Sequence, residues 1–212
     1  SGPMQTAKAR SAPLTRAARR AAYFDLCQPL LSDLRHGKSD HGFARLAGRY
    51  QGRLFDLQAL PDALSYRKLP CLWLMATLTE PMPVAGTISL MMRPSGAEVF
   101  SRFSTLPLQV GLPPGFPEHA VLRCDRAGDL SPVDLLARAQ DLFTQPEAKE
   151  LVLSPKGLRI VWLAEQADRT RYLIYRDSEL GHQPLEQAVL RPLLDRLVSL
   201  ADDLCPAPPE CL

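Results

Sequence analysis

The chain has 212 residues, of which 46% are hydrophobic and 23% are charged. These proportions are typical of a folded globular protein and exclude a disordered or fibrous chain. A chain of this length is expected to bury about 70% of its unfolded surface, so its core needs neither a metal nor a disulfide. The 20 prolines and 12 glycines are scattered, which predicts many short elements joined by tight connections.

The formal charge of +2 is unevenly distributed along the chain. Residues 4–22, the basic arm, carry all five basic residues of the first 24 positions and no acid, and the rest has 20 basic residues (25 minus 5) against 23 acidic ones. A nucleic-acid binder usually spreads basic charge over its folded surface, so we expect no nucleic acid as partner. The arm supplies three candidate binding residues, Arg16, Arg19 and Arg20.

The sequence shows no secretory signal and no membrane-spanning segment, and together with the cysteines this leads us to expect a cytoplasmic protein, with the periphery of the inner membrane as an alternative location. The longest apolar run, Cys71–Ala76, is far shorter than the ~20 residues that span a bilayer. Residues 1–3 resemble the remnant of a cleaved tag, and we take Met4 as the natural start. The five cysteines form no C-x-x-C pair, which favours reduced thiols, and Cys27 and Cys71 are expected in the core.

The N-terminal quarter is expected to be helical, with Thr15 as the first cap and a proline that divides the first helix. Alternating or β-branched apolar runs then predict strands, two of which, 71–78 and 87–92, are expected to pair as a hairpin. The predicted helices lie at 15–27, 29–35 and around 43–48, the loop at 36–42, and the strands at 53–59, 71–78, 87–92, 108–110 and 120–124.

The second half contains the clearest hairpin, with its turn at Ser154–Gly157 between two apolar runs. A serine and a proline at 131–132 predict the start of a helix, and a leucine stripe containing Pro192 predicts a kinked closing helix. The predicted elements are a helix at 131–143, a turn at 147–149, strands at 151–153, 158–164 and 171–176, a helix at 185–204 and a disordered tail at 205–212.

Strands and helices come in clusters, which favours an α+β fold with an antiparallel or mixed sheet, packed helices, and helices at both the N-terminal and C-terminal ends. Residues 23–204 are expected to form one globular domain. Two arrangements stay open: one sheet with helices on a face, or two related αβ sub-units.

In order along the chain, five segments resemble a group of uncharacterised bacterial proteins, and the match spans about residues 45–200. The resemblance implies a strand pair, a proline-rich segment, a helix and a second hairpin; some relatives are membrane-anchored, and no reaction is implied. The segments are Arg49–Arg53, Arg67–Pro70, Leu112–Pro117, Lys149–Leu151 and Gly157–Val161.

No local motif names a chemistry. His36, Asp40 and His41 could supply metal ligands, but their spacing matches no ligand pattern and a solvated polar loop is favoured, so we expect no metal and no cofactor. His119 and His182 are expected at the surface. A G-x-S-x-G elbow, a phosphate loop and a dinucleotide fingerprint are all absent from the sequence, and no catalytic residue is assigned.

Two further arginines, Arg159 and Arg171, complete the candidate binding residues. On one sheet face they could clamp a phosphate or carboxylate, although an ordinary solvated face is the favoured interpretation. Trp73 and Trp162 lie in apolar runs and are expected in the core.

The sequence therefore favours a non-enzymatic binding or scaffold module that contacts a protein partner or the membrane periphery. The alternative is a small hydrolase or transferase whose site is built from loops at 93–103 and 113–119. The basic arm could attach the protein to an anionic surface; alternatively, its apolar stripe packs on the body.

Overall fold

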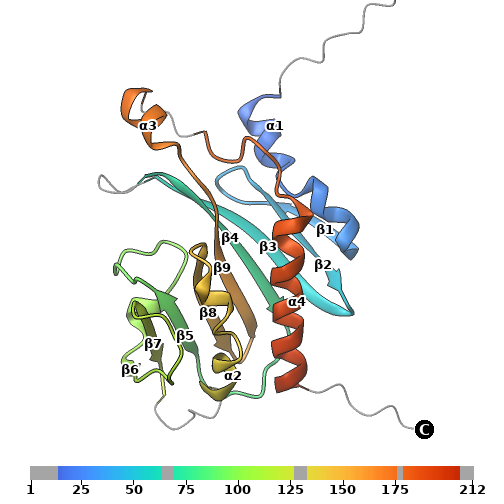
Figure 1. Ribbon diagram of the computed structural model, residues 1–212. Coiled ribbons are helices and arrows are strands. Elements are labelled where there is room, and N and C mark those ends of the chain that lie inside the picture. The colour runs from blue at the N-terminus through green and yellow to red at the C-terminus, as the bar shows by residue number, and fades with distance from the viewer. Residues whose placement is uncertain (1–13, 64–68, 127–132, 176–178, 206–212) are drawn as a thin grey trace, which may run out of the picture.

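The computed structural model describes residues 14–63, 69–126, 133–175 and 179–205 (Figure 1). Its centre is one nine-stranded antiparallel sheet with the strand order β1-β2-β3-β4-β9-β8-β5-β7-β6. The strands are β1 Ser32–Lys38, β2 Ala44–Tyr50, β3 Arg53–Asp62, β4 Cys71–Thr79, β5 Ile88–Met92, β6 Leu108–Val110, β7 Ala120–Cys124, β8 Ala148–Ser154 and β9 Gly157–Gln166.

Among the described residues, four α-helices and three short 3-10 helices accompany the sheet, so the α+β class is confirmed, and the strands of the same residues form one sheet. The helices are α1 Arg16–Ala21, α2 Val133–Ala137, α3 Arg169–Tyr175 and α4 Gln187–Leu204, and the 3-10 segments are Asp25–Leu30, Phe103–Thr105 and Leu142–Thr144. No helix in this part of the chain is long and apolar enough to cross a membrane.

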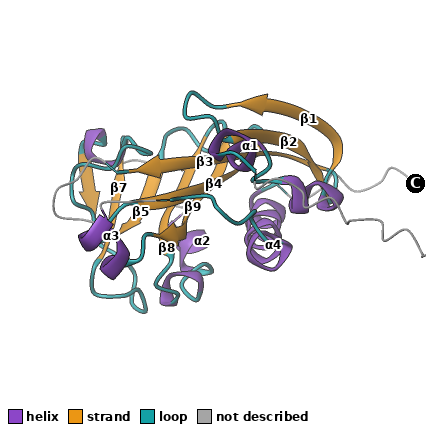
Figure 2. Cartoon of the chain, turned by 90° about the horizontal axis from the view of Figure 1, so that it is seen from above, coloured by secondary structure: helices purple, strands orange, loops and turns teal. Residues whose placement is uncertain are grey.

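The two faces of the sheet are covered differently. The first face carries the main hydrophobic core and packs against α4 and α2, which lie on the same side of the sheet (Figure 2). The second face carries a smaller apolar cluster that includes Met75, Met91 and Val161, and it is covered by the 3-10 helix Phe103–Thr105 and the loop before it. We call residues 93–106 the covering segment.

Strand β4 shows how the sequence encodes this two-sided burial. Leu72, Leu74 and Leu78 pack in the first-face core, whereas Trp73 and Met75 belong to the second-face cluster. Because the strand is apolar on both faces, its sequence is a continuous apolar run rather than an alternating one.

Several predicted elements are confirmed. The hairpin turn at Ser154–Gly157 joins β8 to β9, and Thr15 caps α1 by accepting a hydrogen bond from the amide of Ala18 at 3.1 Å. Cys27 and Cys71 are buried, and Pro192 lies within α4. The strands predicted at 53–59, 71–78, 87–92, 108–110 and 120–124 correspond to β3, β4, β5, β6 and β7.

Four predictions around the first strands are wrong. The predicted helix at 43–48 is strand β2, where burial alternates with a period of two, and the second helical piece at 29–35 gives way to β1 at Ser32. The predicted loop at 36–42 shrinks because β1 extends to Lys38. Strands β4 and β5 are not a hairpin: the β8–β9 hairpin lies between them, so each pairs with a strand distant in sequence.

The second half brings three more corrections. The predicted strand at 171–176 is helix α3 where the structure describes it, and Asp168 accepts the backbone N–H of Arg171 at 2.8 Å near the helix start. The predicted turn at 147–149 overlaps β8, which begins at Ala148. Helix α2 ends at Ala137, well before the predicted 143. The proposed cap at 131–132, arm residues 4–13 and tail residues 206–212 lie outside the described residues.

Candidate functional site

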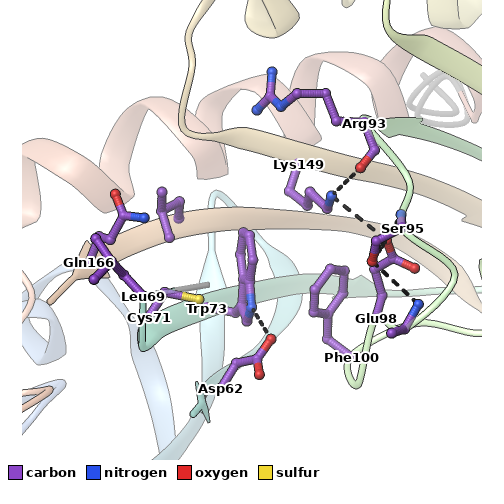
Figure 3. A pocket seen from close by; sticks show the side chains of 12 residues that line it. Asp62, Leu69, Cys71, Trp73, Arg93, Ser95, Glu98, Phe100, Lys149 and Gln166 are labelled. Carbon is purple, nitrogen blue, oxygen red and sulfur yellow. Dashed lines mark hydrogen bonds and ion pairs between the residues drawn. The ribbon is translucent and has the colours of Figure 1, made fainter. Parts of the chain in front are cut away.

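A large cavity lies on the second face of the sheet, beneath the covering segment (Figure 3). Its volume of about 630 Å³ is within the range typical of small-molecule sites, about 300–1,000 Å³. Six of its lining residues are polar or charged, and the other six are apolar or aromatic. The lining residues are Asp62, Leu69, Cys71, Trp73, Arg93, Ser95, Ala97, Glu98, Phe100, Lys149, Leu163 and Gln166.

Two β-bulges shape the floor of this cavity. The register of β8 against β9 shifts between Ala148 and Glu150, so Lys149 is an extra residue in the strand. The register of β4 against β9 shifts between Leu72 and Trp73. A bulge turns a side chain away from its regular alternation, and the β8 bulge lets Lys149 and Glu150, although adjacent in sequence, line two cavities on the same face.

The buried Lys149 ammonium holds the start of the covering segment. Its Nζ donates to the carbonyl oxygens of Met92 at 2.8 Å and Arg93 at 3.1 Å, and it lies 3.8 Å from Oε1 of Glu98. Arg93 has a φ of 46°, a left-handed conformation uncommon for a residue with a side chain. These contacts stabilise the sharp bend that turns the chain from β5 back over the sheet.

Glu98 also stabilises this bend through hydrogen bonds with Ser95 and Gly96. Its carboxylate accepts hydrogen bonds from the backbone N–H of Ser95 at 2.6 Å and of Gly96 at 3.2 Å, and from the Ser95 hydroxyl at 3.0 Å. Burial alone would raise the pKa of Glu98, but these hydrogen bonds and the Lys149 ammonium outweigh it and lower the pKa. A carboxylate with a lowered pKa is a poor general base, so the arrangement does not activate the Ser95 hydroxyl as a nucleophile.

A second cavity of about 360 Å³ adjoins the first across Phe100. At its base lies Glu150, which is only 1% exposed and whose Oε2 accepts hydrogen bonds from the hydroxyls of Ser89 at 2.7 Å and Ser101 at 2.5 Å. Ser101 belongs to the covering segment, so this carboxylate fixes the segment at a second point. Burial raises the pKa of Glu150, which the two serine hydroxyls and the Arg159 guanidinium partly oppose.

The raised pKa of Glu150 leads us to predict a pH-dependent effect of the substitution Glu150→Gln. Because the folded state holds the proton more tightly than the unfolded chain, the stability contributed by Glu150 falls as the pH rises from its ordinary value of 4.5 through the raised one. Glutamine does not titrate, yet its side-chain oxygen can accept both serine hydroxyls. Urea denaturation should therefore show the variant gaining stability relative to the wild type as the pH rises above about 4.5. A difference between the two proteins that does not change with pH would contradict the burial of a charged carboxylate here.

The wall of the larger cavity is aromatic. The rings of Trp73 and Phe100 lie 4.8 Å apart between centroids, and the Trp73 indole N–H donates to Asp62 at 3.4 Å (Figure 3). Trp162, in contrast, is 9% exposed and lies in the first-face core, as predicted. The same prediction for Trp73 is only partly correct, because its side chain packs on the second-face cluster but also lines the cavity.

The five predicted binding arginines lie in three parts of the fold. Arg16 is exposed on α1, the Arg19 guanidinium donates to the carbonyl of Leu14, and the Arg20 guanidinium donates to the carbonyl of His41 at 2.7 Å. Arg159 lines the smaller cavity, and its Nε donates to Thr77 at 2.9 Å. Arg171 lies on helix α3, so the predicted clamp of Arg159 and Arg171 on one sheet face is not formed.

Within the described ranges, no three histidine, cysteine, aspartate or glutamate side chains gather as metal ligands. His36 lies on β1, whereas Asp40 and His41 lie in the following turn, and all three are exposed. His119 and His182 are exposed too.

Segment 93–103, one of the two predicted loop sites, lines both cavities, whereas 113–119 lines neither of them. Lys149 and Glu150 were not predicted as site residues from the sequence. Their signal was a charged pair inside an otherwise apolar strand, between Ala148 and Leu151.

The comparisons with known proteins leave the family open. No family model matches the sequence, and no curated protein matches it. One solved structure to which the chain is similar is the mycobacterial trehalose monomycolate transport factor A, TtfA, with a TM-score of 0.42 and 11% identity over 91% of this chain and 98% of that one.

Proposed function

We propose that the protein is a non-enzymatic binding module that holds a small amphipathic molecule in the larger cavity. The observation that carries this proposal is the combination of about 630 Å³ of space with an aromatic wall and a basic end. Ligand sites of this size are mostly apolar, with a few convergent polar groups that fix the orientation of the ligand.

The lining residues suggest how such a molecule would lie. Its apolar part would contact Trp73, Phe100 and Leu163, which offer a flat ring face and an aliphatic surface. Its polar end would face Arg93, since the Lys149 ammonium already contacts two carbonyl oxygens and Glu98. We therefore infer that an anionic end, such as a carboxylate, is preferred over a neutral one.

The lining supports binding better than catalysis. Among the described residues of the cavity there is no histidine, and the Ser95 hydroxyl faces a carboxylate whose pKa is lowered. In this proposal the module retains or presents its ligand to a protein partner or at the membrane periphery and changes no bond in it.

Calorimetric titration with octanoate and with 1-octanol tests the proposal. Octanoate is expected to bind, and Trp73→Ala is expected to weaken binding by about tenfold or more because the aromatic wall is lost. Trp162→Phe is the matched control, since Trp162 lies in the other core, and it should bind octanoate as the wild type does.

Two outcomes would contradict the proposal. If the wild type binds neither octanoate nor 1-octanol, the proposal that the cavity holds an amphipathic molecule is wrong. If octanoate and 1-octanol bind with equal affinity, the inference that the cavity prefers a ligand with an anionic end is wrong.

A further inference from the structure

Large apolar side chains are most exposed at two helices, α1 and α3. The highest exposed fractions among the large hydrophobic residues of the described chain are those of Ile174 (65%), Leu14 (59%) and Leu173 (55%). Leu14 directly precedes the cap of α1, and the other two lie on α3. Side chains this exposed contribute little to the core and are accessible to a partner, and exposed apolar patches mark protein or membrane interaction sites.

Both helices lie at the same end of the molecule, uppermost in Figure 1, and Figure 2, which looks down on that end, shows both of them there. Helix α1 is held to the body because Arg20 donates to the His41 carbonyl and its guanidinium lies 4.6 Å from the centre of the Phe43 ring. Helix α3 follows β9, whose continuation is fixed by the N–H of Ala167 donating to Pro70 at 2.8 Å. The fold therefore places the two helices at one end of the molecule.

Positive charge accompanies the exposed apolar groups on both helices. Helix α1 carries Arg16 and Arg19, and α3 carries Arg169 and Arg171. Neither helix contains an acidic residue; Asp168, just before α3, accepts a backbone N–H of that helix. Apolar residues beside arginines on a short exposed helix are the combination that binds the interface of an anionic membrane.

We propose that this end of the molecule, defined by Leu14–Ala21 and Arg169–Tyr175, docks on an anionic lipid surface. Two separated helices at the same end of the molecule match a planar partner. A protein partner would instead need a continuous patch of about 800 Å² on this chain. The apolar side chains enter the headgroup region while the arginines contact lipid phosphates. This surface is distinct from the cavity.

Sedimentation of the full chain with vesicles tests the docking surface. Vesicles of equal parts phosphatidylcholine and phosphatidylglycerol should carry the protein down, and pure phosphatidylcholine vesicles should not. Binding should be lost at about 0.5 M NaCl, where screening shortens the reach of charge interactions to a few ångströms.

Paired variants assign the binding to α3. The double variant Leu173→Gln/Ile174→Gln should reduce partitioning at least about tenfold, and so should Arg169→Gln/Arg171→Gln. Each has a matched control on exposed residues elsewhere: Val99→Gln/Leu108→Gln for the apolar pair and Arg102→Gln/Arg138→Gln for the arginines. Tryptophan emission and the melting temperature establish that each variant is folded.

Two results would overturn the proposal. One is the absence of sedimentation with the anionic vesicles. The other is an equal loss of vesicle binding in the variants and in their controls. The binding would then depend on the overall charge or hydrophobicity of the protein and not on α3.

Discussion

Trp162→Ala is expected to lower the free energy of unfolding by about 3–5 kcal/mol. The indole is 9% exposed and lies in the first-face core, where its strand neighbours are Leu74 and Ala148. Alanine would leave a cavity that the surrounding sheet and α4 cannot fill without moving.

Urea denaturation measures this loss, and Trp73→Ala provides the internal comparison. Because Trp73 is only partly buried, its removal should destabilise the protein by less than the removal of the buried Trp162. A loss below about 1 kcal/mol for Trp162→Ala would place its side chain at the surface, contrary to the structure.

Gly157→Ala is expected to destabilise the protein by about 3 kcal/mol or more, because it combines backbone strain with overpacking. Gly157 has a φ of 151°, and a Cβ atom there would lie 2.0 Å from the carbonyl oxygen of Leu78. This turn joins β8 to β9, and both strands lie near the middle of the sheet, so the strain would affect the centre of the sheet.

Gly52→Ala is the matched control for this substitution. Gly52 also has a positive φ, 78°, but a Cβ atom there would meet no other atom within 4 Å. Its replacement should cost only the backbone strain, about 1–2 kcal/mol. Equal losses for the two variants would contradict the close approach of Leu78 to the turn.

The elements that the sequence predicted correctly are those whose signal is local. The hairpin at Ser154–Gly157 has a proline and a glycine between two apolar runs, and α4 has a leucine stripe. Strand β2 was missed because its central Gly48 and two alanines weaken the alternating pattern. The glycine is needed there, since a Cβ would approach both Leu31 and the Ser32 carbonyl to 2.9 Å.

Strand pairing could not be predicted because it depends on contacts far apart in the sequence. Strand β4 pairs with β9, so Trp73 lies beside Leu163, and the expected partner β5 lies two strands further along. The proline-rich connection between residues 79 and 88 resembles a hairpin turn in its local sequence. The pairing of β4 with β5 is excluded only because the β8–β9 hairpin lies between these two strands.

The candidate site was predictable only in part, for the same reason. The first part of the covering segment was predicted as a loop that could build a site, and it lines both cavities. The contacts that fix the covering segment come from Lys149 and Glu150. These two adjacent residues lie on the same face of the sheet because of a β-bulge, and no local sequence pattern predicts that bulge. Arg159, predicted from its charge, does reach a cavity, whereas the other four arginines lie elsewhere.

The most direct test of the proposed binding function uses the two tryptophans as reporters. The chain contains only two, so an amide and indole correlation spectrum of ¹⁵N-labelled protein should show two indole N–H signals, which Trp73→Phe assigns. On titration with octanoate, the Trp73 signal should shift saturably while the Trp162 signal stays in place, since Trp73 lines the cavity and Trp162 lies in the other core. A Trp73 signal that does not move, or moves only together with that of Trp162 as the protein unfolds, would contradict the account.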